Sequence, residues 1–216
     1  NSYDERVKEL TQKVSIQHDK LMVQAEVISK KRVAGFKGLC AEITNNLSHL
    51  GMVDAEFKVE HQKLKEINVN GVDDIVFMFS ANKGVNLQEL KKAASGGELS
   101  RLMLTIKSIL AKNNKLASII FDEIDTGVSG DIADKMASIM QQMSVKMQVL
   151  SITHLPQVAA KGEHHFKIYK ENVNEKTTTS LIVLNKEERV EELAKMLSGK
   201  KMSDAAKENA IALLNS

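Results

Sequence analysis

The segment that most restricts the fold of this chain is residues 119–130, IIFDEIDTGVSG. An apolar run leads directly into two neighbouring carboxylates, Asp122 and Glu123, and then into a turn that contains glycine. A short continuous apolar run is typical of a buried parallel strand, and open α/β sheets bind ligands beyond the carboxyl ends of such strands. Neighbouring side chains on a strand point to opposite faces, so we expect the two carboxylates to have different tasks. The segment therefore predicts a ligand site at a strand end.

The composition indicates a helix-rich chain. Its 216 residues, 43% of them hydrophobic, can form one sizeable core plus an appendage. The formal net charge of +2 argues neither for nor against nucleic-acid binding. Cys40 is the one cysteine, which excludes an internal disulfide framework and suits a reducing cytoplasm. The sequence has no transmembrane-length apolar run and no signal peptide, and the missing initiator Met suggests a piece of something longer.

Residues 1–50 are highly charged and repeat with a helical period. Seven residues are spaced as heptad a and d positions: Val7, Leu10, Val14, Gln17, Leu21, Gln24 and Ile28. Five of the seven are apolar. The pattern favours one strand of a two-helix coiled coil over an ordinary amphipathic helix, although the glutamines weaken the seam. The partner strand must come from elsewhere, because the chain has no second heptad run. The helical period continues beyond Gly35 and Gly38, and Gly51 marks its expected end.

The rest of the chain alternates strands and helices. Residues 55–61 and 74–80 are strand-like, with a turn at Asn70 and Gly71 between them and a loop at 81–94 after them. We then expect a helix from 95, a strand at 117–123, a helix from about 129, a strand at 148–154, a helical turn at 155–160, a hairpin over 164–170 and 178–184, and helices at about 187–198 (capped by Asn185 and Glu188) and 203–215. The strand–helix–strand order over 95–160 predicts parallel pairing.

The motif Ser95-Gly96-Gly97-Glu98 begins one of these helices. Ser95 and Glu98 fit a capping box, and a structural cap alone is one interpretation. A cap does not need two consecutive glycines in the first helical turn, where each lowers helix propensity. Glycine lets the amides of a helix N-terminus approach a phosphate, and the Ser95 hydroxyl adds a donor. The motif therefore favours a phosphate site.

Asp122 and Glu123 form a Walker-B pattern, in which the Asp orders Mg²⁺ and the Glu polarises an attacking water. Two solvated carboxylates at a strand end are the structural alternative. Asp125 either belongs to the same acidic turn or is a solvent-facing turn residue. His154 follows the next predicted strand, where a lone His usually has no function. His154 becomes a candidate site residue because the Ser95–Glu98 motif and the Asp122-Glu123 pattern should lie at the same edge of the sheet.

Some patterns are missing from the sequence. His164 and His165 face opposite ways on a strand, and no Cys or His stands at zinc-ligand spacing, so we expect no zinc site. A Walker A loop, Gly-x₄-Gly-Lys-[Ser/Thr], is absent as well. In the one Gly-Lys pair, Gly199-Lys200, Ala194 replaces the first glycine and Lys201 the hydroxyl residue. A cradle for the α- and β-phosphates must therefore come in trans or from a part of the polypeptide outside this sequence.

Three motifs stand in order along the chain: ASGGELSR at 94–101, IIFDEIDTGVSG at 119–130 and SITHLPQVAA at 151–160. Together they closely resemble the RecN family of bacterial DNA-repair ATPases, relatives of the SMC proteins within the ABC ATPase superfamily. The likeness to that family's C-terminal half extends from about residue 29 to the end. Any one motif indicates only the wider ABC/SMC group, whereas DTGVSG with THLPQVA is more specific to RecN.

The resemblance assigns a role to each matched residue. The ABC signature, which touches the γ-phosphate of ATP held by the opposing head, corresponds to Ser95, Gly96, Gly97 and Glu98. Asp122 matches the Mg²⁺ ligand, Glu123 the catalytic base and His154 the switch histidine. The D-loop, which links two active sites across a dimer, corresponds to Thr126, Gly127, Val128, Ser129 and Gly130. Ser129 stands where many relatives have Asp, so its cross-dimer contact is left open.

By resemblance, the chain is an α/β lobe, the C-terminal half of an ABC/SMC-type ATPase head with a mostly parallel sheet flanked by helices. Residues 1–50 would be a coiled-coil helix returning to the head and residues 51–216 the half-head, while the other half carries the Walker A and Q-loop. Two heads would hold ATP and Mg²⁺ between them and hydrolyse the ATP during DNA double-strand-break repair and recombination.

The implied partners are DNA, the N-terminal half of the same head and a second head in a homodimer. The implied location is the bacterial cytoplasm at the nucleoid, without a membrane. We expect this chain alone to bind ATP weakly and not to hydrolyse it. The alternatives are an SMC-type chromosome-organising ATPase and a non-enzymatic DNA-binding or scaffold module.

Overall fold

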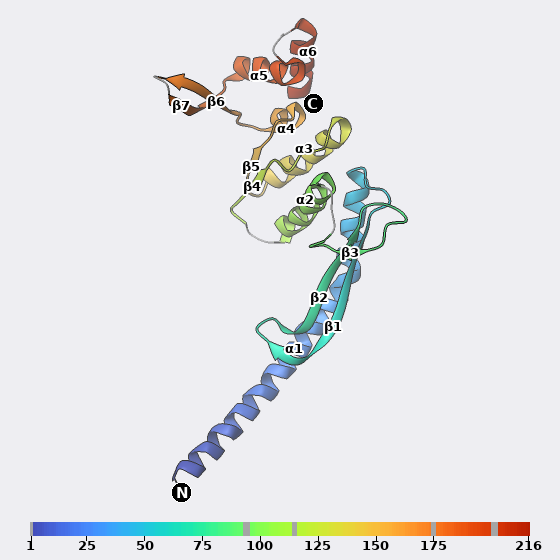
Figure 1. Ribbon diagram of the computed structural model, residues 1–216, viewed down its shortest axis with the longest axis vertical. Helices are drawn as coiled ribbons and strands as arrows, with labels where there is room; N and C mark the ends of the chain where they lie inside the picture. Colours follow the sequence, from blue (N-terminus) through green and yellow to red (C-terminus); the bar gives the residue numbers. More distant parts are fainter. Residues whose placement is uncertain (1, 93–95, 114–115, 174–175, 200–202) are drawn as a thin grey trace. The chain divides into compact units, whose positions relative to one another are not determined.

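Figure 1 shows a computed structural model of the chain, which describes residues 2–92, 96–113, 116–173, 176–199 and 203–216. The chain divides into two compact units. The first contains residues 1–48 and 52–94, and the second contains residues 49–51 and 95–216. Within the described ranges, no helix is both long enough and apolar enough to cross a membrane.

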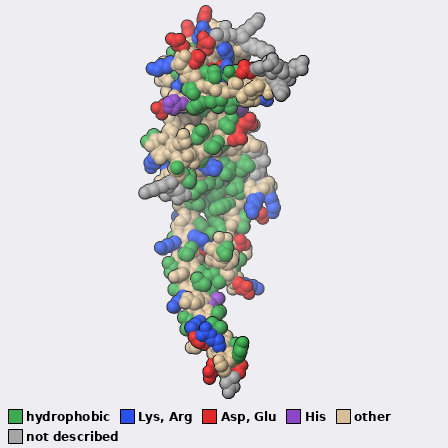
Figure 2. Space-filling view, turned by 90° about the vertical axis from the view of Figure 1, so that its left-hand side faces the viewer, with side chains coloured by type: hydrophobic (Ala, Val, Ile, Leu, Met, Phe, Trp, Pro, Cys, Tyr) green, Lys and Arg blue, Asp and Glu red, His purple; other side chains and the backbone are tan. Residues whose placement is uncertain are grey.

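The first unit begins with the long helix α1 (Ser2–His49), which continues through Gly35 and Gly38. The helix ends where the sequence predicted: Gly51 has a φ of 78°, and the Met52 N–H donates to the Leu47 carbonyl (2.9 Å), the hydrogen bond of a Schellman stop. The heptad residues towards the N-terminus are exposed. At the lower end of Figure 2, where this part of α1 lies, apolar side chains stand among charged ones. Such an exposed seam is what a coiled-coil partner covers.

An antiparallel sheet of β1 (Glu56–Asn68), β2 (Gly71–Ser80) and β3 (Gln88–Glu89) completes this unit. The β1–β2 hairpin lies along α1 (Figure 1). Its register runs from Glu56↔Ser80 to Lys63↔Asp73, and the pairing shifts before Asn68↔Gly71. The predicted turn at Asn70 and Gly71 is confirmed to within a residue, but β1 and β2 are longer than the sequence suggested. The prediction of an unbroken loop over 81–94 is wrong at β3.

A buried carboxylate joins α1 to the hairpin. The Asp73 side chain is completely buried; the Ser29 hydroxyl donates to its Oδ1 (2.6 Å), and the Arg32 guanidinium donates to its Oδ2 (2.9 Å). His61 Nε2 lies 2.8 Å from Oδ1, and its ring also packs against Phe36. The hydrogen bonds from Ser29 and His61, supported by Arg32, hold the pKa of the Asp73 carboxyl well below its usual range.

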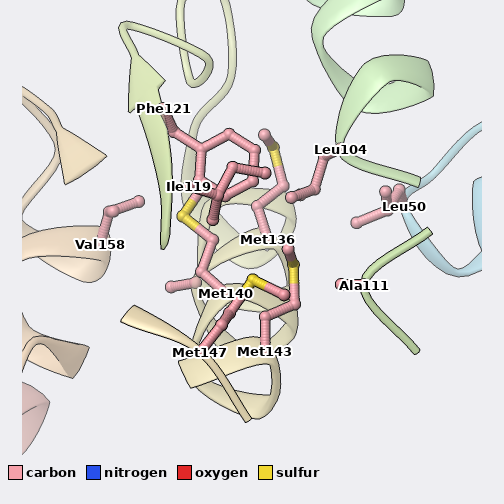
Figure 3. Close-up of a cluster of buried hydrophobic side chains, with 11 residues drawn as sticks. Leu50, Leu104, Ala111, Ile119, Phe121, Met136, Met140, Met143, Met147 and Val158 are labelled. Carbon is pink, nitrogen blue, oxygen red and sulfur yellow. The ribbon is translucent and has the colours of Figure 1, made fainter. Parts of the chain in front are cut away.

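The second unit is built around α2 (Gly96–Asn113), β4 (Ser118–Asp122), α3 (Gly130–Ser144) and β5 (Gln148–Ile152). The two strands pair in parallel, from Ser118↔Gln148 to Asp122↔Ile152, as the strand–helix–strand order predicted. One face of the pair is buried against the methionines of α3. Figure 3 shows Phe121 and Ile119 of β4 directed towards Met136 and Met140. This core fixes the strand whose end carries the two carboxylates.

The remaining elements are α4 (Pro156–Lys161), β6 (Phe166–Val173), β7 (Lys176–Val183), α5 (Lys186–Ser198) and α6 (Asp204–Leu214). The predicted hairpin is confirmed, since β6 and β7 pair antiparallel, and among the described strands β4 and β5 form the one parallel pair. The predicted capping box of Asn185 and Glu188 is present at α5. The Arg189 guanidinium donates to the carbonyls of Ala160, Gly162 and Glu163, which ties α5 to the end of α4.

Candidate functional site

Asp122 and Glu123 lie at the carboxyl end of β4, and both side chains are exposed. Only Asp122 belongs to the strand. Glu123 has a φ of 47°, in the left-handed region that costs a non-glycine residue about 1–2 kcal/mol. Its N–H donates to the Ile152 carbonyl (3.1 Å), and its own carbonyl accepts from the Thr126 N–H (3.2 Å) and hydroxyl (2.9 Å). The turn, rather than strand alternation, therefore sets the direction of Glu123.

Asp125 does not face solvent, which was one of the two alternatives left open by the sequence. Its side chain is 1% exposed. The Thr153 hydroxyl donates to Asp125 Oδ2 and itself accepts from the Leu155 N–H (2.9 Å). His154 Nδ1 lies 4.0 Å from Asp125 Oδ1, while the imidazole is 63% exposed. The turn after β4 and the segment after β5 are thus joined through a buried carboxylate.

The segment from Thr126 to Gly130 connects this turn to α3. Val128 is half-buried against the core of Figure 3, and its N–H donates to the Asp125 carbonyl (3.2 Å). Gly127 and Gly130 have φ values of 74° and 58°, a backbone region that favours glycine. Ser129 is the N-cap residue of α3, but its exposed side chain makes no capping hydrogen bond. The Ser129 hydroxyl is therefore not used to hold the helix.

The N-terminus of α2 packs against the same segment. A Cβ added to Gly97 would lie 3.2 Å from the Thr126 carbonyl oxygen and 3.5 Å from that of Gly127, whereas one added to Gly96 would meet none of the described residues within 4 Å. Arg101 Nε donates to the Gly97 carbonyl (3.1 Å), and its Nη1 donates to the Leu50 carbonyl (3.1 Å). Glu98 lies in the first turn of α2. Ser95, and with it the predicted capping box, lies outside the described residues.

The structure therefore brings the three motifs together within one unit. Through these contacts, α2 packs on the turn after β4, and that turn is bonded to the segment after β5. The edge combines exposed carboxylates, an exposed imidazole and a helix N-terminus whose amides and dipole favour anions. Such a set suits a phosphate ester with a hard cation.

Magnesium was expected at Asp122. No group of three or more His, Cys, Asp or Glu side chains in the described ranges could hold a metal ion unaided. Magnesium that accompanies a nucleotide usually needs only one or two protein carboxylates, because phosphate oxygens and waters supply the other ligands. An exposed carboxylate at a strand end, as Asp122 provides, fits a share of such a site.

Sequence reasoning missed several residues of this edge. Thr153 and Arg101 form hydrogen bonds that hold the turn and the start of α2, yet neither stood out as a site residue. The burial of Asp125 carried no local signal, because its partner Thr153 is distant in the sequence. The paired glycines marked this position in the sequence, but we attributed them to a phosphate and not to the close approach of another backbone segment.

Comparison with known proteins was decisive for the family. The chain is 39% identical over 216 residues to the DNA repair protein RecN of Halalkalibacterium halodurans, covering 98% of this chain and 38% of that protein. It is 42% identical over 207 residues to RecN of Bacillus subtilis, covering 89% of this chain and 36% of that protein. The chain belongs to the RecN family. It spans little more than a third of the length of these RecN proteins, and no family model matches it.

Solved structures agree with a RecN-type lobe. The Smc head domain of Pyrococcus furiosus, with an extended coiled coil and bound to the C-terminal domain of ScpA, has a TM-score of 0.58 at 13% identity, covering 91% of this chain and 46% of that chain. A chain from work on ATP-driven dimerization and DNA-stimulated activation of SMC ATPases has a TM-score of 0.52 at 15% identity, covering 82% of this chain and 99% of that chain. The fold is that of the C-terminal lobe of an SMC-type ATPase head.

Proposed function

We propose that this chain is the C-terminal part of a RecN-type ATPase that acts in DNA double-strand-break repair and recombination. Two heads would hold ATP and Mg²⁺ between them, and hydrolysis would release the heads. The observation that carries this proposal is the convergence of α2, the turn after β4 and the segment after β5 on one edge of the second unit. The RecN relatives support the repair role, and the SMC ATPase neighbour described for ATP-driven dimerization supports the paired heads.

Each site residue then has a task set by its position. Asp122 holds Mg²⁺, which when bound neutralises charge on the phosphates. Glu123 accepts a proton from the attacking water, and its constrained backbone sets the direction in which its side chain leaves the turn. His154 meets the γ-phosphate side of the same nucleotide. The amides of Gly96 and Gly97, with Ser95 and Glu98, would meet the γ-phosphate held by the opposing head.

The incomplete sheet supports a missing half-head. Parallel sheets are normally covered on both faces. Here the face of the β4–β5 pair that points away from α3 carries the exposed side chains of Ile120 (65% exposed), Leu150 and Ile152. We infer that the N-terminal half of the same head, with the Walker A loop and the Q-loop, covers this face. Residues 1–50 would be the returning coiled-coil helix and residues 51–216 the half-head.

Other parts of the proposal concern the complete protein. Its partners would be DNA and a second copy of the head, and it would act in the bacterial cytoplasm at the nucleoid. Direct DNA contacts are not assigned to residues of this chain. The alternatives are an SMC-type chromosome-organising ATPase, which a hinge domain within the parent's coiled coil would favour, and a non-enzymatic DNA-binding or scaffold module, which would not dimerise in response to nucleotide.

The test combines this chain with a separately produced N-terminal half. ATP binding and hydrolysis are measured for each part and for the mixture, and association of the heads is followed by sedimentation. We expect weak binding and no hydrolysis by the chain alone, and both activities in the mixture. Robust turnover by the chain alone, or a mixture without ATP-dependent association, would contradict the proposal.

A substitution at Glu123 tests the assigned base in the same mixture. Glu123→Gln should lower turnover by about 10²–10⁴-fold and leave ATP-driven head association intact, because the amide cannot take up the proton. The matched control is Glu208→Gln, an exposed carboxylate on α6, which should change neither quantity. If nucleotide binding falls as steeply as turnover in Glu123→Gln, Glu123 is not the base.

A further inference from the structure

The buried carboxylate of Asp125 has one oxygen in use and one that is not. Oδ2 accepts from the Thr153 hydroxyl, whereas Oδ1 is buried and has no hydrogen-bond partner among the residues that the structure describes. A buried acceptor left unpaired destabilises the fold, and more so when it is charged. Holding Thr153 needs only one oxygen of Asp125. The second oxygen therefore requires a separate explanation.

The imidazole of His154 supplies that explanation. Its Nδ1 lies 4.0 Å from Asp125 Oδ1, so a displacement of about 1 Å would form a hydrogen bond. Thr153, the residue before His154, holds the histidine near Asp125. The Thr153 hydroxyl donates to Asp125 and accepts from the Leu155 N–H. The backbone of Asp125 is held by the Val128 N–H, which donates to the Asp125 carbonyl, and the carboxylate is held by the Thr153 hydroxyl. Hydrogen bonds of this kind are often long before a ligand binds.

We propose that Asp125 is a positioning residue for His154. Its Oδ1 accepts a hydrogen bond from Nδ1–H of the neutral ring, which fixes both the ring orientation and the tautomer. Nε2 is then left unprotonated and directed away from Asp125, on the exposed side of the ring, where it can accept a hydrogen bond. The use of that acceptor for a nucleotide or its attacking water rests on the function proposed above, but the Asp125–His154 contact does not.

The contact is tested by nitrogen NMR on the 216-residue chain with ¹⁵N-labelled histidine. Long-range proton–nitrogen spectra, recorded at a pH where the rings are neutral, report which ring nitrogen carries the proton. The His154 signals are identified by their loss in His154→Gln. We expect the Nδ1–H tautomer for His154 in the unsubstituted chain. The Nε2–H tautomer there would overturn the proposal without any variant of Asp125.

Two carboxylate variants sharpen the result. Asp125→Asn keeps the shape of the side chain but weakens it as an acceptor, so we expect the His154 tautomer to shift towards Nε2–H while the other histidines keep their spectra. Asp134→Asn, at a partly exposed carboxylate on α3, should leave His154 unchanged. An unchanged His154 in a folded Asp125→Asn chain, or an equal shift in Asp134→Asn, would contradict the proposal.

Activity separates this proposal from the function on which it builds. In the mixture of half-heads, Asp125→Asn should lower kcat by about 10–100-fold with little change in KM, the range found for outer-shell partners of site residues. A tautomer shift with unchanged kcat would leave the contact in place but refute its role in turnover. If Glu123→Gln also had no effect on turnover, the assigned function itself would be wrong, whatever the state of His154.

Discussion

The contact of Gly97 with the segment after β4 predicts opposite outcomes for two adjacent glycines. Replacing either glycine by alanine gains up to about 1 kcal/mol of helix propensity. A Cβ on Gly96 meets nothing within 4 Å in the part of the chain that the structure describes, so Gly96→Ala should be neutral or slightly stabilising. A Cβ on Gly97 would lie 3.2 Å from a backbone oxygen of Thr126, and overpacking of this kind costs about 1–3 kcal/mol. Gly97→Ala should therefore be less stable than Gly96→Ala by about 1–3 kcal/mol.

The comparison is made by thermal unfolding and by hydrogen exchange of the β4 amides, which reports on the second unit. A 2 kcal/mol difference corresponds to about 4–8 °C in the midpoint of a chain of this size. Gly96→Ala and Gly97→Ala differ in position but not in chemistry, so each is the control for the other. Equal stability of the two variants would refute the packing argument.

The same pair separates packing from phosphate binding. Both glycines match the signature that we propose to meet the γ-phosphate of the opposing head, so both variants should weaken ATP-driven association of the half-heads. In Gly96→Ala a loss is not explained by packing against the described residues, because none of them lies within 4 Å of the added Cβ. Normal ATP-driven association of Gly96→Ala would remove Gly96 from the phosphate site.

Three further substitutions test the energetics of the fold. Glu123→Gly should raise the free energy of unfolding by up to about 1 kcal/mol because it relieves the left-handed backbone, whereas Glu208→Gly within α6 should lower it by about 1 kcal/mol. Both are measured by urea unfolding, and destabilisation by Glu123→Gly would contradict strain at this turn. The pKa of Asp73 is lowered from 3.8, so the stability that it contributes is complete above about pH 5 and is lost as the pH falls through 3.8 towards the folded pKa. Asp73→Asn should therefore make the loss of stability at acid pH less steep, and an equally steep loss in that variant would exclude Asp73 as its source. Met136→Ala should lower the free energy of unfolding in urea by about 2–5 kcal/mol because the side chain is fully buried. Lys135→Ala, one residue earlier on the solvent side of α3, should change it by no more than about 0.5 kcal/mol, and equal effects would contradict the packing of Figure 3.

Features with a local or periodic signal could be predicted from the sequence. The heptad pattern predicted α1, and the glycine at its end predicted the stop at Gly51. The order of strand, helix and strand predicted the parallel pairing of β4 with β5, and the spacing of Asn185 and Glu188 predicted the cap of α5. In each case the residues that form the structure are neighbours in sequence or repeat at a fixed interval.

Features that depend on distant partners could not be predicted. The outer half of β1 is mostly polar and exposed, and its partly buried residues, Leu64 and Ile67, do not alternate as in a strand. It is held by the pairing of Lys63 with Asp73 and of Asn68 with Gly71, and Lys63 donates to Glu26 of α1. The two-residue strand β3 exists only through its pairing with β2. Asp125 looks like any acidic turn residue until Thr153 is placed beside it. Burial of a polar group is a property of the assembled fold, so no short pattern carries it.

The arrangement of the edge also suggests why its motifs act together. Thr126 touches two of them: its N–H and hydroxyl hold the carbonyl of Glu123, and its own carbonyl lies against Gly97. In the dimer that we propose, a ligand that displaces the start of α2 would therefore act on the residue that holds Glu123 in its left-handed conformation. Most of these contacts are made by closely packed backbone atoms, so a small shift at one end is transmitted to the other. Phosphate contact by one head and direction of the base in the same head would then change together.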